Sequence, residues 1–184
     1  ALGEIELLAD IAEPDIGVIT NVGSAHLDTL KNLQNVATAK SELIKGLPDS
    51  GIAILNYDNH FVRDMKEVFN GKEIIYYGFT EEADLYCKKV SFNKDDLSTE
   101  FIVEYKDKEY KLAINKPGKH LVYNALAAVA VALKLSKFFI FEAKFMGISQ
   151  YDIMNRVAMT NSQNIANWLS CLIRHLILSF FSSS

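Results

Sequence analysis

The hydrophobic residues in the first part of this 184-residue chain gather in short, nearly unbroken runs. Such runs are typical of strands that are buried on both faces, as in a parallel sheet. They occupy residues 15–20, 51–55 and 73–79. The segments beside and between them have apolar residues at helical spacing, which predicts helices over residues 3–13, 33–46 and 60–69. Because helices alternate with strands, the pattern predicts an α/β fold with a partial, doubly wound and mostly parallel sheet.

Two of these helices have apolar stripes that predict which side chains face the core. In the helix over residues 3–13, the stripe consists of Ile5, Leu8, Ile11 and Ala12. In the helix over residues 60–69, the inward-facing side chains are those of Phe61, Met65 and Val68. Both stripes repeat every three to four residues, as one face of a helix requires.

A different pattern begins after residue 82. Alternating apolar and polar positions, separated by charged turns, predict a small antiparallel β meander with one solvated face. Its strands span residues 85–90, 99–105 and 109–114. Pro117 and Gly118 then precede an alanine- and valine-rich helix, which we expect to run from His120 to about Leu135.

The strand and helix order is lost from residue 136 onward. We therefore divide the chain into a domain over residues 1–135 and a divergent helical tail over residues 136–184. Within the tail, residues 146–156 predict a short helix with Ser149 as its cap. Residues 165–181 are strongly apolar but fall short of the roughly 20 apolar residues that span a membrane. We expect them to form a helix that is buried or that docks on a partner.

The overall composition narrows the classes of function. The formal net charge is −4, which gives no basic surface for binding nucleic acid. Cys87 and Cys171 are far apart and have no partner motif, so a disulfide has no support and a reducing compartment is expected. The N-terminus lacks the pattern of a signal peptide. These features favour a cytoplasmic protein that binds neither nucleic acid nor a membrane.

Candidate site residues follow the first predicted strand, which runs into Thr20 and Asn21 and then into a small-residue loop with His26. Ligands bind at this edge of open α/β sheets, and a neutral imidazole can bind a divalent metal or a phosphate oxygen. In the next predicted helix, Lys40 lies in Ala-Thr-Ala-Lys-Ser-Glu, where small neighbours leave room around its amine. From position alone, the alternatives are a loop histidine without a function and a solvated surface lysine.

These residues, in this order, resemble the central ATPase domain of the Mur ligases, which form amide bonds in the bacterial cell-wall precursor. The resemblance implies that His26 is a ligand of the second Mg²⁺ ion. It also implies that Lys40 is carbamylated by carbon dioxide, which turns a cation into an oxygen anion that magnesium prefers. Lys45, near the end of the same helix, is instead interpreted as a surface cation favoured by the helix dipole.

A second match begins at Gly118, where Gly-Lys-His-Leu-Val-Tyr-Asn-Ala-Leu-Ala-Ala resembles the family pattern Gly-x-His-Asn-x-x-Asn-x-x-Ala-Ala. It implies that Asn124 faces the adenine of ATP, since an amide can both donate and accept hydrogen bonds. His120 also matches and, with Thr20 and Asn21, is a candidate for nucleotide binding. Leu121 replaces the first asparagine of the pattern, so the contact of that asparagine is not carried over. The alternative for Asn124 is a helix residue held by a neighbouring backbone group.

Leu-Asn-Tyr-Asp-Asn at residues 55–59 resembles a turn of the same family. Asn and Asp are also ordinary turn residues. A structural and a functional interpretation of this turn therefore stand equal, and we assign no catalytic role to it.

The resemblance covers roughly residues 3–135 and is closest to the enzymes that add D-alanyl-D-alanine to UDP-N-acetylmuramoyl-tripeptide. It implies ATP and Mg²⁺ as cofactors. However, no Gly-x-x-x-x-Gly-Lys-Ser/Thr occurs in the sequence, so the phosphate-binding loop is lacking, and no counterpart of the family's C-terminal domain follows. We therefore expect a ligase fragment that is inactive alone, with a complementary chain as a potential partner.

Two alternative functions remain open from the sequence. The first is a fragment of a ligase similar to folylpolyglutamate synthase, a related group that shares the metal-binding histidine and the modified lysine. The second is a non-catalytic interaction module that docks through the apolar segment at residues 165–181.

Overall fold

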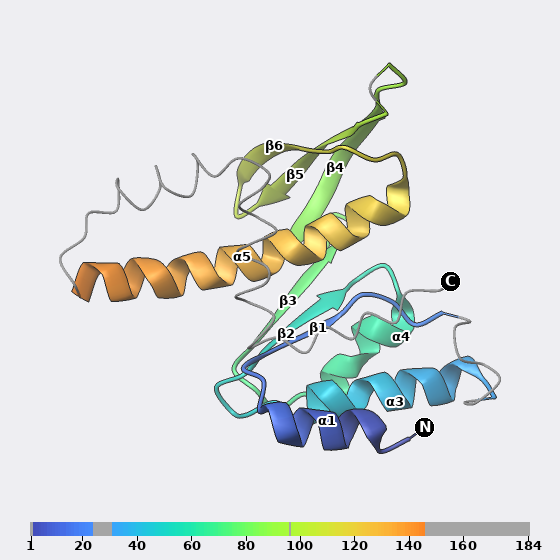
Figure 1. Cartoon of the computed structure of the whole chain (residues 1–184), viewed down its shortest axis with the longest axis vertical. Coiled ribbons are helices and arrows are strands. Elements are labelled where there is room, and N and C mark those ends of the chain that lie inside the picture. Colours follow the sequence, from blue (N-terminus) through green and yellow to red (C-terminus); the bar gives the residue numbers. More distant parts are fainter. Residues whose placement is uncertain (1, 24–30, 96, 146–184) are drawn as a thin grey trace.

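A computed structural model describes residues 2–23, 31–95 and 97–145, which form one six-stranded sheet with helices on both faces (Figure 1). The strands are β1 (Ile16–Ile19), β2 (Ile52–Asn56), β3 (Glu73–Gly78), β4 (Leu85–Phe92), β5 (Thr99–Tyr105) and β6 (Lys108–Ile114). The helices are α1 (Glu4–Ala12), α3 (Leu33–Lys45), α4 (His60–Arg63), the 3₁₀ helix η1 (Asp64–Val68) and α5 (Lys119–Phe145).

The strands lie in the sheet in the same order as in the chain. β1, β2, β3 and β4 run parallel, with Val18 opposite Ile54 and Ile54 opposite Ile75. β5 runs antiparallel to both β4 and β6. The predicted α/β fold is therefore confirmed, and the meander is a continuation of the parallel sheet, because Leu85 of β4 pairs with Tyr77 of β3.

Alternate residues of the central strands point into two separate cores. Val18 and Ile54 contribute to the core beneath α5, whereas Ile19 and Leu55 contribute to the core that α1, α3, α4 and η1 cover. Figure 1 shows α5 crossing one face of the sheet and α1 and α3 lying on the other. This arrangement leaves the carboxyl ends of β1, β2 and β3 between the two helical layers, where loops and helix starts meet.

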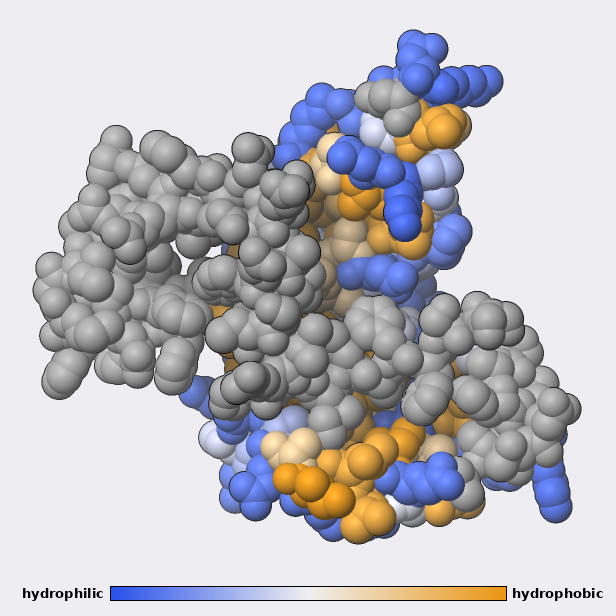
Figure 2. Space-filling view, viewed as in Figure 1, coloured by the Kyte–Doolittle hydropathy of each residue, from blue (hydrophilic) through white to orange (hydrophobic). Residues whose placement is uncertain are grey.

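The predicted inner stripe of α1 is wrong for Leu8, Ile11 and Ala12, which are exposed, whereas Ile5 is half-buried against the core. Ala9 is the buried residue of this helix, at 3% exposure, whereas Leu8 and Ile11 are 51% and 72% exposed. The exposed apolar side chains contribute to the orange surface over α1 in Figure 2. The reason lies in α3, because the carboxylate of Glu42 accepts hydrogen bonds from the backbone amides of Gly3 and Glu6 and fixes how α1 faces its neighbour.

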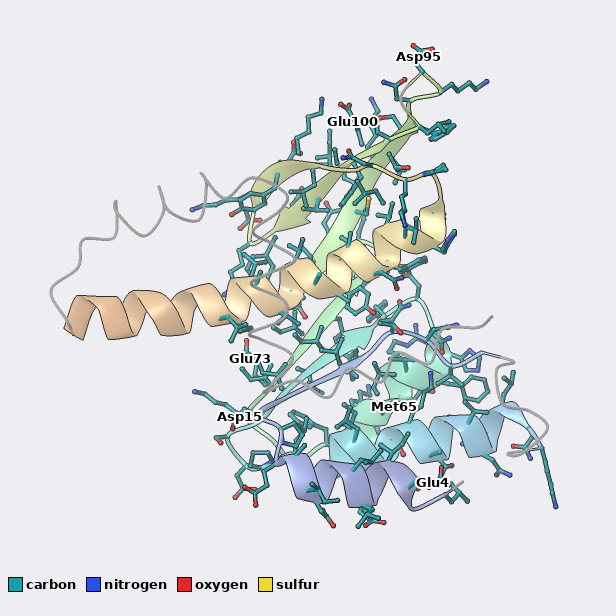
Figure 3. The ribbon with its side chains drawn as sticks, in the orientation of Figure 1. Glu4, Asp15, Met65, Glu73, Asp95 and Glu100 are labelled. Carbon is teal, nitrogen blue, oxygen red and sulfur yellow. The ribbon has the colours of Figure 1, made fainter. Side chains whose placement is uncertain are left out.

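The segment predicted as one helix over residues 60–69 consists of the short helix α4 and the tighter helix η1. Met65, labelled in Figure 3, is buried as predicted, and Phe61 is half-buried. Val68 is 38% exposed, so its predicted inward position is wrong. A 3₁₀ turn has three residues per turn rather than 3.6, which rotates the last residues of the segment away from the core.

Helix α5 continues to Phe145, so its predicted end near Leu135 is wrong. Neither glycine nor proline occurs between residues 119 and 145 to stop it. The predicted helices at residues 146–156 and 165–181 lie outside the described residues, and the division of the chain at residue 135 stays a prediction. In the described part of the chain, no helix combines the length and the apolar character that crossing a membrane requires.

Candidate functional site

The loop that follows β1 is held in place by side chains from two other elements. The backbone carbonyl of Thr20 accepts a hydrogen bond of 2.9 Å from the side-chain amide of Asn56, at the end of β2. The side-chain amide of Asn59, the N-cap of α4, donates to the Val22 carbonyl at 3.0 Å and to Oδ1 of Asn21 at 2.6 Å. The start of the loop at the carboxyl end of β1 therefore has a defined backbone conformation.

Lys40 reaches this loop from α3. Its Nζ donates a hydrogen bond of 2.7 Å to the backbone carbonyl of Asn21. The neighbouring Ala37 and Ala39 are buried against the core, and Lys40 is itself half-buried. Burial lowers the pKa of the Lys40 amine, because removal from water disfavours the charged form. The amine is thus closer to its nucleophilic, neutral state than that of an exposed lysine, whereas Lys45 is exposed as predicted.

Asp58 joins the ends of β2 and β3 to helix α5. Its carboxylate accepts hydrogen bonds from the backbone amides of Phe79 at 2.7 Å and Thr80 at 3.3 Å, and from the Thr80 hydroxyl. It also accepts a bond of 2.8 Å from the hydroxyl of Tyr123 in the first turns of α5. Burial alone would raise the pKa of Asp58, but these hydrogen bonds outweigh it and hold the pKa below its usual value.

An aromatic pair lies beside this carboxylate. The rings of Phe79 and Tyr123 are 4.8 Å apart at an interplanar angle of 64°, an edge-to-face contact. The ammonium group of Lys119 lies 4.4 Å from the centre of the Phe79 ring. Burial and the hydrogen bond to Asp58 raise the pKa of the Tyr123 hydroxyl, so Tyr123 acts as the donor in this contact. The pair fixes the beginning of α5 against the carboxyl end of β3.

His120 and Asn124 are both exposed and lie four residues apart, so they occupy one face of α5. Gly118 precedes them with φ of 134°, a conformation that favours glycine. A Cβ atom at Gly118 would also lie 2.7 Å from the His120 ring. The glycine of the motif therefore permits both the turn into α5 and the position of the histidine.

The structure brings two predicted site residues into direct contact, Lys40 and Asn21, and Thr20 directly precedes Asn21 in the chain. It places His120 and Asn124 on the helix that Asp58 ties to the same edge of the sheet. His26 lies outside the described residues. Within residues 2–23, 31–95 and 97–145, no three His, Cys, Asp or Glu side chains form a cluster that could hold a metal ion.

Sequence reasoning missed the contacts of the turn after β2. For the turn that contains Asp58 and Asn59, a structural and a functional interpretation stand equal from the sequence, and neither Tyr123 nor Thr80 has a predicted role. One signal was present, since polar residues that follow neighbouring parallel strands lie at the same edge of the sheet. Which of them bond to one another depends on side-chain geometry, which a single sequence does not give.

Comparisons with known proteins agree with this architecture. The family model described as "Mur ligase middle domain" matches residues 1–132. UDP-N-acetylmuramate--L-alanine ligase of Desulfatibacillum aliphaticivorans is 33% identical over 67% of this chain and 26% of that protein. UDP-N-acetylmuramoyl-tripeptide--D-alanyl-D-alanine ligase of Mycobacterium bovis is 35% identical over 72% of this chain and 26% of that protein. The chain therefore spans about a quarter of the length of these relatives.

Solved structures of the family have the same fold. A crystal structure of MurF from Acinetobacter baumannii superposes with a TM-score of 0.67 and 25% identity, over 88% of this chain and 32% of that one. MurF ligase from Thermotoga maritima, in complex with ADP, superposes with a TM-score of 0.62 and 25% identity, over 81% and 31% of the two chains. From the match to the middle-domain model and these relatives, we conclude that the chain belongs to the Mur ligase family.

Proposed function

We propose that this chain supplies the metal-binding and adenine-binding part of the ATP site of a peptidoglycan-precursor ligase. The observation that carries the proposal is the contact between the half-buried Lys40 amine and the Asn21 carbonyl, at the carboxyl edge of the parallel sheet. Ligands of open α/β folds bind at this edge. The family supports the same conclusion, since one of its solved members holds ADP.

The magnesium part of the site would be built from Lys40 and His26. Lys40 fits this role, because burial lowers the pKa of its amine and the small, buried Ala37 and Ala39 precede it, which favours carbamylation of the amine. A carbamate offers the oxygen ligands that Mg²⁺ prefers, and bound Mg²⁺ would neutralise charge on the phosphate oxygens. The Asn21 carbonyl would orient the Lys40 nitrogen, which keeps one N–H after carbamylation.

The adenine part would be built from His120 and Asn124 on the exposed face of α5. An amide can satisfy both a donor and an acceptor of the base, which gives Asn124 a specific role. Asn21, which contacts Lys40, and the preceding Thr20 would face the phosphates rather than the adenine. The two ends of the nucleotide would thus contact different helices of the domain.

In the reaction that we propose, the substrate carboxylate attacks the γ-phosphorus of ATP and releases ADP, which forms an acyl phosphate. The amine of the second substrate then attacks the acyl carbon, and the tetrahedral adduct collapses to an amide and inorganic phosphate, with loss of a proton. Positioning and charge neutralisation would be the main contributions of the protein. Since the 184 residues contain no Gly-x-x-x-x-Gly-Lys-Ser/Thr, a complementary segment or chain would supply the phosphate loop. We therefore expect no turnover of ATP by these residues alone.

For the substrate we propose addition of D-alanyl-D-alanine to UDP-N-acetylmuramoyl-tripeptide. The similarity to the MurF structures and to the mycobacterial ligase of that specificity supports it. The second candidate is addition of L-alanine to UDP-N-acetylmuramate, because ligases of that specificity are 33% to 36% identical to this chain. Substrate assays of the complete ligase, with each amine offered separately, distinguish the two.

The proposal is tested by thermal unfolding of the 184-residue chain in bicarbonate buffer, with and without Mg²⁺ and ATP. A ligand that binds only the folded state raises the melting temperature. We expect this increase in the wild type, and a smaller one in Lys40→Ala and in Asn124→Ala. The matched control is Asn70→Ala, which removes an exposed amide outside the site and should keep the full increase. Equal increases in all four proteins, or none in the wild type, would contradict the proposal.

A further inference from the structure

We infer that the turn at residues 56–59, between β2 and α4, is a positioning element that holds both halves of the site. The inference rests on the proposed function, which gives the two halves their meaning. None of the four residues needs to touch a substrate in this role. The turn acts through the loop after β1 on one side and through helix α5 on the other.

The contacts toward the metal half come from two asparagines. Asn56 is 6% exposed and donates its side-chain amide to the Thr20 carbonyl. Asn59 donates to the Val22 carbonyl and to the Asn21 side chain. Because Lys40 bonds to the Asn21 carbonyl, these donors also fix the acceptor that receives the Lys40 amine. The turn therefore determines the position of the Asn21 carbonyl relative to the Lys40 amine.

The contacts toward the adenine half all go through Asp58. Its carboxylate holds the amides of Phe79 and Thr80 at the end of β3 and the hydroxyl of Tyr123 in α5. Tyr123 directly precedes Asn124, so a shift of the tyrosine moves the asparagine with it. A Cβ atom at Gly78 would lie 2.8 Å from the Asp58 carboxylate, which shows how closely β3 passes this group.

The turn is also held from within, so it can transmit position from one half to the other. Asn56 Oδ1 accepts a hydrogen bond of 3.0 Å from the Asp58 amide, while Asn59 Oδ1 accepts one of 3.2 Å from the Val62 amide and caps α4. In both asparagines the side-chain NH₂ group donates to the loop after β1, while the side-chain oxygen accepts from a backbone amide of the turn or of α4. Such shared hydrogen bonds couple the positions of the groups they join.

Two substitutions test the two halves of the site separately, and neither removes packed volume from the core. Tyr123→Phe deletes only the hydroxyl that bonds Asp58 and keeps the edge-to-face contact with Phe79. Asn59→Ser keeps a good N-cap for α4 but is too short to reach the loop after β1. The matched control is Tyr110→Phe, because Tyr110 is exposed on β6, away from the site.

The first readout is amide hydrogen exchange of the full 184-residue chain without ligand. Loss of one hydrogen bond should speed exchange locally by about twofold to tenfold. We expect this at residues 119–124 in Tyr123→Phe and at residues 20–23 in Asn59→Ser. Exchange in β5 and β6 should stay unchanged in both, and Tyr110→Phe should show neither local effect. Wild-type exchange at both segments in the two variants would overturn the inference.

The second readout is the binding of ATP as a function of Mg²⁺ concentration. We expect Tyr123→Phe to weaken ATP binding by about twofold to tenfold at every Mg²⁺ concentration. Asn59→Ser should instead raise the Mg²⁺ concentration needed for half-maximal binding by a similar factor. A loss of general stability would move both quantities in both variants, and that result would overturn the positioning role.

Comparison with Asn124→Ala separates failure of the inference from failure of the proposed function. If Asn124→Ala weakens ATP binding but Tyr123→Phe and Asn59→Ser leave it unchanged, the proposed function stands and the positioning role is overturned. If the wild type binds no ATP, the proposed function fails. Hydrogen exchange then still decides whether the turn fixes both segments.

Discussion

The Lys40 amine lies 2.7 Å from the backbone carbonyl of Asn21, a contact between α3 and the loop after β1. The contact joins the two segments that resemble the Mur ligases, namely the loop that contains Asn21 and the helix that contains Lys40. The contact is compatible with either state of the lysine, because a carbamate nitrogen keeps one N–H for the Asn21 carbonyl. The carbamate oxygens would then point away from that carbonyl.

The first prediction concerns this lysine. In ¹³C-labelled bicarbonate at mildly alkaline pH, we expect a carbamate carbon signal from Lys40 that is distinct from the signal of the terminal α-amine, because burial lowers the pKa of the Lys40 amine. Lys40→Arg should abolish the signal. Lys45→Arg, at an exposed position of the same helix, is the control and should retain it. If the signal assigned to Lys40 survives in Lys40→Arg, another amine is its source and the prediction fails.

The second prediction concerns the dependence of stability on acid. The hydrogen bonds of Asp58 depress its pKa in the folded chain, so the stabilisation is fully present above the unfolded value of about 3.9. It is lost as the pH falls through the lower folded value. Asp58→Asn should therefore be less stable than the wild type near neutral pH, and the difference should shrink below about pH 4.

Urea unfolding of both proteins measures this difference, over a range from about 1.4 pH units below the unfolded carboxyl pKa to about 3 pH units above it. The control is Asp95→Asn, because Asp95 lies exposed in the turn between β4 and β5. A constant difference between wild type and Asp58→Asn over the whole range would contradict a depressed pKa.

The third prediction concerns the close approach of β3 to Asp58. In Gly78→Ala, the new Cβ atom would lie within 2.8–2.9 Å of the carboxylate atoms, so the carboxylate must move. We expect a loss of about 1–3 kcal/mol in the free energy of unfolding, as for other overpacked sites. The hydrogen exchange of residues 119–124 should rise as well. If stability falls but that exchange stays unchanged, Asp58 does not hold α5.

The fourth prediction concerns an ion pair between α5 and the start of β3, where Figure 3 labels Glu73. The Lys134 side chain is 8% exposed, whereas that of Glu73 is 41% exposed. Glu73→Gln leaves a buried ammonium without its partner and should cost about 3 kcal/mol. Lys134→Met removes the buried charge, keeps most of the apolar stem and should change stability by less than about 1 kcal/mol.

Chemical denaturation of the two variants tests this asymmetry. The exposed pair of Lys111 and Glu100 is the control, and neither Lys111→Met nor Glu100→Gln should change stability by more than about 1 kcal/mol. Equal losses of stability in Glu73→Gln and Lys134→Met would contradict the predicted asymmetry. They would mean that the cost of burying an unpaired Lys134 ammonium does not dominate the effect of Glu73→Gln.

Much of the fold could be predicted because hydrophobic spacing is a local property. The runs that became β1 and β2 are buried almost throughout, and the run that became β3 is buried or half-buried. The alternation around Phe101 and Val103 correctly predicted a meander strand. The stripe of α1 could not be predicted in the same way. Its orientation depends on Glu42, whose carboxylate lies far along the sequence and binds the amides of Gly3 and Glu6.

In the candidate site too, local motifs could be predicted from the sequence, whereas contacts between distant residues could not. Lys40 and Asn124 could be singled out because each belongs to a short motif with fixed spacing. The link between Asp58 and Tyr123 could not, since it joins residues 65 positions apart through one side-chain hydrogen bond. Such a bond requires the packing of α5 on the sheet, which hydrophobic periodicity predicts only as a layer and not as a set of contacts.

The most direct test of the account is a titration of the ¹⁵N-labelled chain with Mg²⁺ and ATP in bicarbonate buffer, followed by amide chemical shifts. This measurement detects weak binding and locates it. We predict that the shifts gather at residues 20–23 and at residues 119–124, and that Lys89 and Lys111 on the meander stay unchanged. Shifts confined to the meander, or none at either predicted segment, would contradict the claim that this edge of the sheet binds the nucleotide.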